Sequence, residues 1–150
     1  MTTNQQQPDR KHNLLTDLPQ QTKVGVYARG TTKKNYRRRQ VDDGIALARE
    51  LGWTDEQIIP FQEDCIPPGI LDSDKYEGLS ALVTCIARGE IKAVIVSNEA
   101  RLFRDATGIE ANVFIRLCQE HTVFVITRQT TYDFTNPFLV KLFRAQRENG

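Results

Sequence analysis

The chain has 150 residues, a net charge of +1 and only three cysteines and two histidines. Its length predicts one domain, and 39% hydrophobic with 26% charged residues is ordinary globular composition. Its longest apolar runs are far shorter than the ~20 residues that cross a bilayer, and no secretory signal pattern begins the chain. The widely spaced cysteines argue against a disulfide framework or a zinc site. We therefore expect a cytoplasmic protein that needs no membrane and has no cysteine- or histidine-rich metal site.

Charge is unevenly distributed along the chain. Residues 23–40 hold seven basic residues and no acidic one, whereas residues 41–80 hold ten acidic residues against Arg49 and Lys75. The basic segment has two interpretations. It is either an edge that binds polyanions such as a phosphate backbone, or a solvated loop and helix start.

The predicted elements begin after residues 1–22, whose Gln, Asn, Thr and Pro content indicates a disordered leader. Short apolar runs then alternate with helical patterns, and glycines or an Asn-Pro pair mark the helix ends. The predicted strands are 24–28, 58–61, 91–96, 123–126 and a short fifth at 132–134. The predicted helices are 38–51, 76–88, 109–121 and 136–148. This alternation predicts an α/β fold, a mostly parallel four- to five-stranded sheet flanked by helices.

Arginines follow several of the predicted strands, at the edge where such sheets bind ligands. A hydroxyl, on Thr31 or Thr32, lies two or three residues beyond the first of them. Guanidinium groups suit bidentate phosphate contact, and a hydroxyl among arginines without metal ligands indicates covalent phosphoryl chemistry. The arginines at this edge are Arg29, Arg101, Arg104 and Arg128.

Several segments, taken together in order and spacing, resemble the serine site-specific recombinases, the family of resolvases, invertases and large serine integrases. Residues 27–32, Tyr-Ala-Arg-Gly-Thr-Thr, with Gln40 downstream, resemble the family's opening Tyr-x-Arg-Val-Ser motif. Residues 99–105, Glu-Ala-Arg-Leu-Phe-Arg-Asp, resemble its Asp-Arg-Leu-Ser-Arg-Asp loop after the third strand. Residues 72–79 resemble its Arg-Pro-x-Leu helix start, and residues 132–134 precede the last helix as in the family.

The resemblance covers residues 23–150 and implies a resolvase-like catalytic domain. In the family, a serine hydroxyl attacks a DNA phosphodiester and forms a phosphoseryl link. The strands then exchange, and the protein is expelled without cofactor or metal. The family's last helix is long, and a DNA-reading domain normally follows it. This chain stops early in that helix, so we expect no DNA-reading domain here. The implied partners are double-stranded DNA, from a mobile element, and further copies in a dimer or tetramer of the full-length protein.

Carried over residue by residue, the resemblance implies five catalytic residues. Arg29 would bind the scissile phosphate, Thr31 takes the place of the nucleophile, and Gln40 helps to shape the site. Arg101 and Arg104 match the two arginines of the later loop, which bind phosphate and assist the leaving oxygen. The residues expected to contact the DNA backbone are Lys33, Lys34, Arg37, Arg38 and Lys75.

Three positions depart from the family pattern. Thr31 replaces the serine, and its added methyl restricts χ1 and crowds an in-line approach. Ala100 stands where the family has an aspartate. Lys75, or Asp74 in another register, stands where an arginine is expected, and lysine lacks the bidentate fork. A second hypothesis is therefore a catalytically degenerate module that binds DNA or a partner without cleavage.

A third hypothesis is an unrelated α/β enzyme that binds phosphate. Such an enzyme needs a glycine-rich cradle after the first strand, and Gly30 alone is poor support for one. Thr31 also has a structural interpretation, as a loop or helix-cap hydroxyl.

Overall fold

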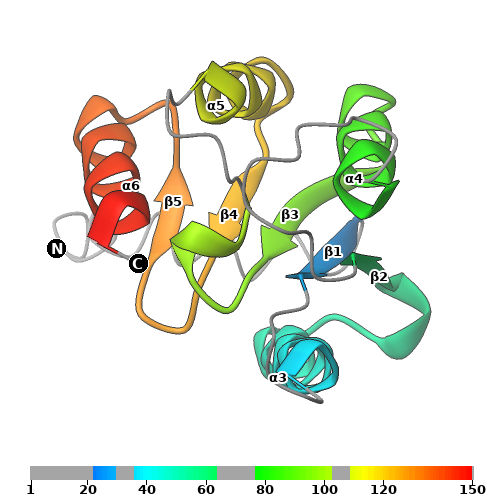
Figure 1. The fold of residues 1–150 in the computed structure, drawn as a ribbon. Coiled ribbons are helices and arrows are strands. Elements are labelled where there is room, and N and C mark those ends of the chain that lie inside the picture. The colour runs from blue at the N-terminus through cyan, green and yellow to red at the C-terminus, as the bar shows by residue number, and fades with distance from the viewer. Residues whose placement is uncertain (1–21, 30–35, 64–76, 103–108, 150) are drawn as a thin grey trace, which may run out of the picture.

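The computed structural model describes residues 22–29, 36–63, 77–102 and 109–149. One sheet lies between two layers of helices (Figure 1). The strand order is β2-β1-β3-β4-β5, in which the first four strands are parallel and β5 runs antiparallel to β4. The strands are β1 (Lys23–Arg29), β2 (Ile58–Glu63), β3 (Ile91–Ile95), β4 (Phe124–Ile126) and β5 (Thr131–Asp133). The predicted α/β architecture is thus confirmed, whereas residues 1–21 of the predicted leader lie outside the described residues.

Within the described residues, four α-helices cover the two faces of the sheet. In Figure 1, α3 lies below the sheet, α4 and α5 lie above it, and α6 lies beside β5. They are α3 (Tyr36–Leu51), α4 (Glu77–Ala87), α5 (Ile109–His121) and α6 (Pro137–Asn149), with 3-10 turns η1 (Asp55–Gln57) and η3 (Glu99–Arg101). No described helix is long and apolar enough to cross a membrane.

Each face of the sheet has its own apolar core, because successive side chains of a strand point to opposite faces and both sets are apolar. Val26 and Ile95 pack beneath α3 together with Trp53. Their neighbours Tyr27 and Val94 pack on the other face with residues of α4, α5 and α6. This double burial explains why the strands are apolar throughout.

The predicted helix ends are confirmed. Gly52 and Gly89 have φ values of 111° and 74°, in the left-handed region that favours glycine at a helix end. Asn136 caps α6, because its Oδ1 accepts a hydrogen bond from the Phe138 backbone N–H at 3.0 Å. One expected polar loop instead contains η3, where Asn98 Oδ1 accepts from the Ala100 N–H at 2.9 Å.

The close packing of α3 on β1 positions a residue of the candidate site. A Cβ at Gly44 would lie 2.4 Å from Val26 Cγ1, so only glycine lets the helix pack this near the strand. Gln40 is one helical turn before Gly44 and therefore faces the same way. The contact thus brings Gln40 to the carboxyl end of β1.

Candidate functional site

The candidate site lies where the chain connections diverge in the sheet. From β1 the chain crosses to β2 on one side, whereas β3 lies on the other side of β1 and continues to β4. Such a switch point leaves a crevice outside the carboxyl ends of the two strands, where open α/β sheets bind ligands. Arg29 ends β1 at this point, and residues 97–101 follow β3.

Gln40 fixes the last residue of β1 by two hydrogen bonds to its backbone. Its Nε2 donates to the Arg29 carbonyl at 2.7 Å, and its Oε1 accepts from the Arg29 N–H at 3.3 Å. The Ser97 hydroxyl donates to the same Oε1 at 3.4 Å. Gln40 and Arg29 are each only 5% exposed, so these bonds satisfy polar groups that water does not reach.

The Arg29 guanidinium crosses to the segment that follows β3. Its Nη2 donates to the Ala100 carbonyl at 2.9 Å, a contact between residues 71 positions apart in the chain. Ala100 stands where the resembled family has an aspartate, and here its backbone oxygen receives the arginine. Arg101 is the next residue of η3, and its Nε is buried. Arg29 therefore meets the segment that carries Arg101.

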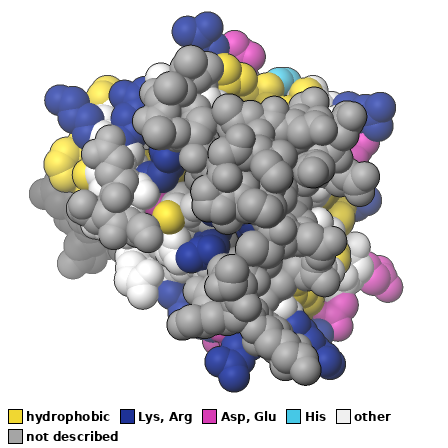
Figure 2. Space-filling view, in the orientation of Figure 1, with side chains coloured by type: hydrophobic (Ala, Val, Ile, Leu, Met, Phe, Trp, Pro, Cys, Tyr) yellow, Lys and Arg dark blue, Asp and Glu magenta, His cyan; other side chains and the backbone are white. Residues whose placement is uncertain are grey.

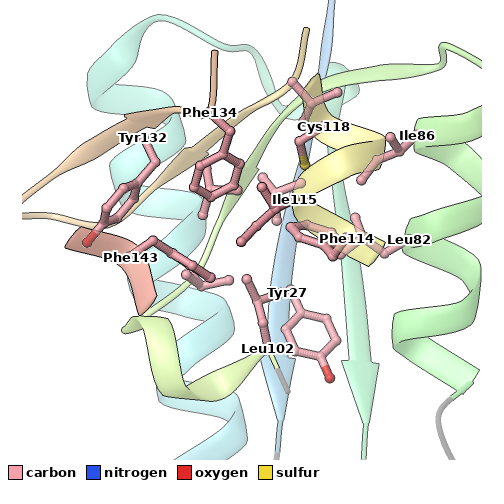
Figure 3. Close-up of a cluster of buried hydrophobic side chains, with 14 of the residues drawn as sticks. Tyr27, Leu82, Ile86, Leu102, Phe114, Ile115, Cys118, Tyr132, Phe134 and Phe143 are labelled. Carbon is pink, nitrogen blue, oxygen red and sulfur yellow. The ribbon is translucent and has the colours of Figure 1, made fainter. Parts of the chain in front are cut away.

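Tyr132 of β5 holds the same turn from another side. Its hydroxyl donates a hydrogen bond to Glu99 Oε2, and its side chain is fully buried. Burial, together with the hydrogen bond and negative charge of Glu99, raises the pKa of Tyr132 well above its usual range. Tyr132, Phe134 and Phe143 cluster in Figure 3, with ring centroids 5.9 Å and 5.2 Å from that of Tyr132.

A hollow of about 130 Å³ opens beside Gln40, on the α3 face of the sheet. Its lining includes Ser97 and Arg128, together with Gly44 and Ile95. The Arg128 Nη1 pairs with Glu50 Oε2 of α3 at 3.2 Å, and both side chains are about half exposed. Arg128 is thus at the predicted edge of the sheet, held by an acidic partner.

The structure brings three of the five predicted catalytic residues to the carboxyl ends of β1 and β3. They are Arg29, Gln40 and Arg101, of which Arg101 belongs to the η3 turn that Arg29 contacts. Arg38 is exposed near the start of α3. The backbone of Arg37 is in α3, but its side chain lies outside the described part of the chain. The other predicted site residues lie outside the described residues; they are Thr31, Arg104, Lys33, Lys34 and Lys75.

Two residues of this site were not predicted, Glu99 and Tyr132. The sequence pattern placed Glu99 in the later loop and Tyr132 before the last helix, but nothing in the pattern paired them. Figure 2 shows Lys and Arg side chains around the rim of one face and also near its centre. The described residues contain no group of three or more His, Cys, Asp or Glu side chains placed to hold a metal ion.

Solved structures share this fold. The N-terminal catalytic domain of TP901-1 integrase matches with a TM-score of 0.61 and 17% identity, covering 85% of this chain and 95% of that one. The C-terminal catalytic domain of ISC1926 TnpA, an IS607-like serine recombinase, matches with a TM-score of 0.53 and 18% identity, covering 70% and 69%. A resolvase family site-specific recombinase from Streptococcus pneumoniae matches with a TM-score of 0.53 and 17% identity, covering 86% and 90%.

The chain therefore has the fold of the serine recombinase catalytic domains, which confirms the fold that the sequence resemblance implied. No protein-family model matches the sequence, and no curated protein sequence matches it.

Proposed function

We propose that the chain is a recombinase-like catalytic domain that cuts and rejoins DNA phosphodiesters through a covalent link between a hydroxyl and the phosphate. The observation that carries this proposal is the contact between Arg29 and the η3 turn, at 2.9 Å, at the β1/β3 switch point. That contact unites the two segments whose residues match the family's phosphate-binding arginines. In this proposal the domain acts in the cytoplasm on double-stranded DNA of a mobile element. It does so as part of a dimer or tetramer of the full-length protein.

In the proposed reaction, the Thr31 hydroxyl gives up its proton as its oxygen attacks the scissile phosphorus. A new bond joins Thr31 to the 5′ phosphate, the bond to the 3′ oxygen breaks, and that oxygen takes up a proton as a 3′ hydroxyl. After strand exchange, a 3′ hydroxyl attacks the phosphothreonine and expels Thr31. Arg29, Arg101 and Arg104 neutralise the phosphorane, and the bond energy is kept throughout.

A second candidate function is a degenerate module that binds DNA or a partner without cleaving DNA. A specific observation favours it: Arg29 is 5% exposed and donates to a protein carbonyl. A guanidinium in that position can offer a phosphate only the donors that Ala100 does not take, and its burial limits the access of a phosphate. The replacements of the family's serine by Thr31 and of its aspartate by Ala100 also favour a module that does not cleave DNA.

Adduct formation on suicide DNA tests the reaction. The protein is incubated with a pool of nicked duplexes of random central sequence, and products are separated on a denaturing gel. We expect a protein–DNA adduct that Thr31→Val abolishes and Thr31→Ser increases. The proposal fails if neither the wild type nor Thr31→Ser forms an adduct at high protein concentration.

The double variant Thr31→Ser/Ala100→Asp separates the two candidate functions. If it restores cleavage that the wild type lacks, the wild-type site is attenuated. If it cleaves nothing and still binds the duplex pool, the degenerate module is the better description.

A further inference from the structure

We propose that Tyr132 and Glu99 are positioning residues, which hold the η3 turn so that the Ala100 carbonyl fixes the Arg29 guanidinium. The inference deepens the proposed function, because it assigns two residues to the same site that the family resemblance does not. Neither side chain donates to or accepts from Arg29 in the hydrogen bonds described above. Their effect on Arg29 passes through the backbone of the turn.

Tyr132 is a fixed point in this arrangement. Its side chain is fully buried, and β5 pairs it with Val125 of β4. Phe143 of α6 meets its ring edge-on at 5.2 Å, and Phe134 packs at 5.9 Å (Figure 3). A side chain packed on these sides keeps its rotamer, so the direction of its hydroxyl is set.

The turn that this hydroxyl holds is anchored at both ends. Before it, the Val96 N–H donates to the Ile126 carbonyl at 3.0 Å, and after it the Leu102 side chain is fully buried. Between these anchors, Asn98 caps η3 through the Ala100 N–H, and Tyr132 holds Glu99. A backbone hydrogen bond from the Arg101 N–H to the Asn98 carbonyl, at 3.1 Å, closes the turn, and these two side-chain hydrogen bonds orient its middle.

The consequence falls on Arg29. The Ala100 carbonyl lies 2.9 Å from Arg29 Nη2, within the narrow range of a hydrogen bond. If the Tyr132 bond is lost, Glu99 is released and the Ala100 carbonyl can rotate away from the guanidinium. Phosphoryl transfer is sensitive to such changes, since a displacement of about 1 Å can lower a rate about a hundredfold.

The same contacts connect α6 to the site. Phe143 packs on Tyr132, Tyr132 bonds Glu99, and the residue after Glu99 holds Arg29. The helix α6 also packs directly against η3. A series of contacts thus runs from Phe143 of α6 through Tyr132 and Glu99 to the turn that holds Arg29.

The experiment compares Tyr132→Phe and Glu99→Ala, each of which removes the hydrogen bond between these two side chains, with wild type, using Asn112→Ala as control. Asn112→Ala removes the hydrogen bond from Arg144 of α6 at 2.7 Å but leaves the turn untouched. The first readout needs no DNA: it is solvent exchange of the Arg29 Nη2–H protons, which include the donor to Ala100, in ¹⁵N-labelled protein, with the signal assigned by its loss in Arg29→Lys. The second is the rate of adduct formation at saturating suicide DNA.

We expect both variants to remain folded and to raise the Arg29 exchange rate about tenfold, the scale of one lost charge-assisted hydrogen bond. We also expect the adduct rate to fall about tenfold while the half-saturating DNA concentration stays unchanged, because positioning affects the reaction step. Asn112→Ala changes neither. Glu99→Ala carries the test alone if Tyr132→Phe does not fold.

An unchanged Arg29 exchange rate in the folded variants overturns the inference, whatever the DNA assay gives. Faster exchange in the variants, together with no adduct from any protein including wild type, leaves the positioning roles standing. In that case the proposed cleavage reaction is the part that fails.

Discussion

Arg29 is held in two ways, by Gln40 at its backbone and by the Ala100 carbonyl at its guanidinium. The first contact closes a strand end against a helix, and the second joins two strand ends. Together they fix both the backbone and the side chain of this buried arginine.

Gln40→Ala tests the first of these contacts. It leaves the buried N–H and carbonyl of Arg29 without their side-chain partner, and we expect a loss of about 2–4 kcal/mol in the free energy of unfolding. Urea denaturation followed by circular dichroism measures it. Arg39→Ala, at the neighbouring exposed position, is the control and should stay within about 0.5 kcal/mol of wild type. A similarly small loss for Gln40→Ala would contradict the described bonding.

Tyr132 gives a pH-dependent prediction. Its pKa is raised in the folded state, first by burial and then by Glu99. Its contribution to stability is therefore complete below the ordinary tyrosine pKa of about 10 and is lost as pH rises above that value. Urea midpoints measured from pH 8 upward should fall above pH ~10 more steeply for wild type than for Tyr132→Phe. Parallel curves for the two proteins would show that Tyr132 ionises equally in both states.

At the level of elements, the sequence predicted most of what a local pattern determines. Gly52, Gly89 and Asn136 marked helix ends that the structure confirms. The η3 turn was expected only as a polar loop, because its cap, Asn98, follows a strand without any helical periodicity. Short 3-10 turns carry too few residues to produce a hydrophobic period.

The packing of α3 on β1 makes a prediction at the same scale. Gly44→Ala places a methyl 2.4 Å from Val26 Cγ1, and we expect a loss of about 1–3 kcal/mol in unfolding free energy from overpacking. In the Val26→Ala background that methyl has room, and the helix preference of alanine over glycine should then make Gly44→Ala neutral or favourable. Chemical denaturation of the four proteins measures this cycle. Equal costs of Gly44→Ala in both backgrounds would contradict the close approach.

At the level of the whole molecule, alternation of strands and helices was enough to predict the doubly covered sheet. The candidate site was predictable only in part. Patterns placed Arg29 and Arg101 at carboxyl ends of strands, but their meeting depends on strand order, which no local pattern gives. The hydrogen bond between Tyr132 and Glu99 joins residues 33 positions apart and had no signal in the sequence beyond the two residue types.

The basic stretch before and within α3 allows a test of DNA contact. If Arg38 lies on the phosphate backbone, Arg38→Ala should weaken duplex binding and reduce the slope of log K against log salt by about 1. Fluorescence anisotropy with a 30-bp duplex over a salt series gives the slope. Arg116→Ala, exposed on α5 at the opposite face, is the matched control. Equal slopes for Arg38→Ala and wild type would favour the solvated-face interpretation.

Peptide mass spectrometry of the trapped adduct tests the proposed chemistry most directly. After incubation with suicide DNA, nuclease digestion leaves a nucleotide on the peptide that was joined to the DNA, and fragmentation locates it. We predict a nucleotide joined through its 5′ phosphate to Thr31. An adduct located on any other residue, or none above the level of Thr31→Val, would contradict a recombinase reaction at this hydroxyl.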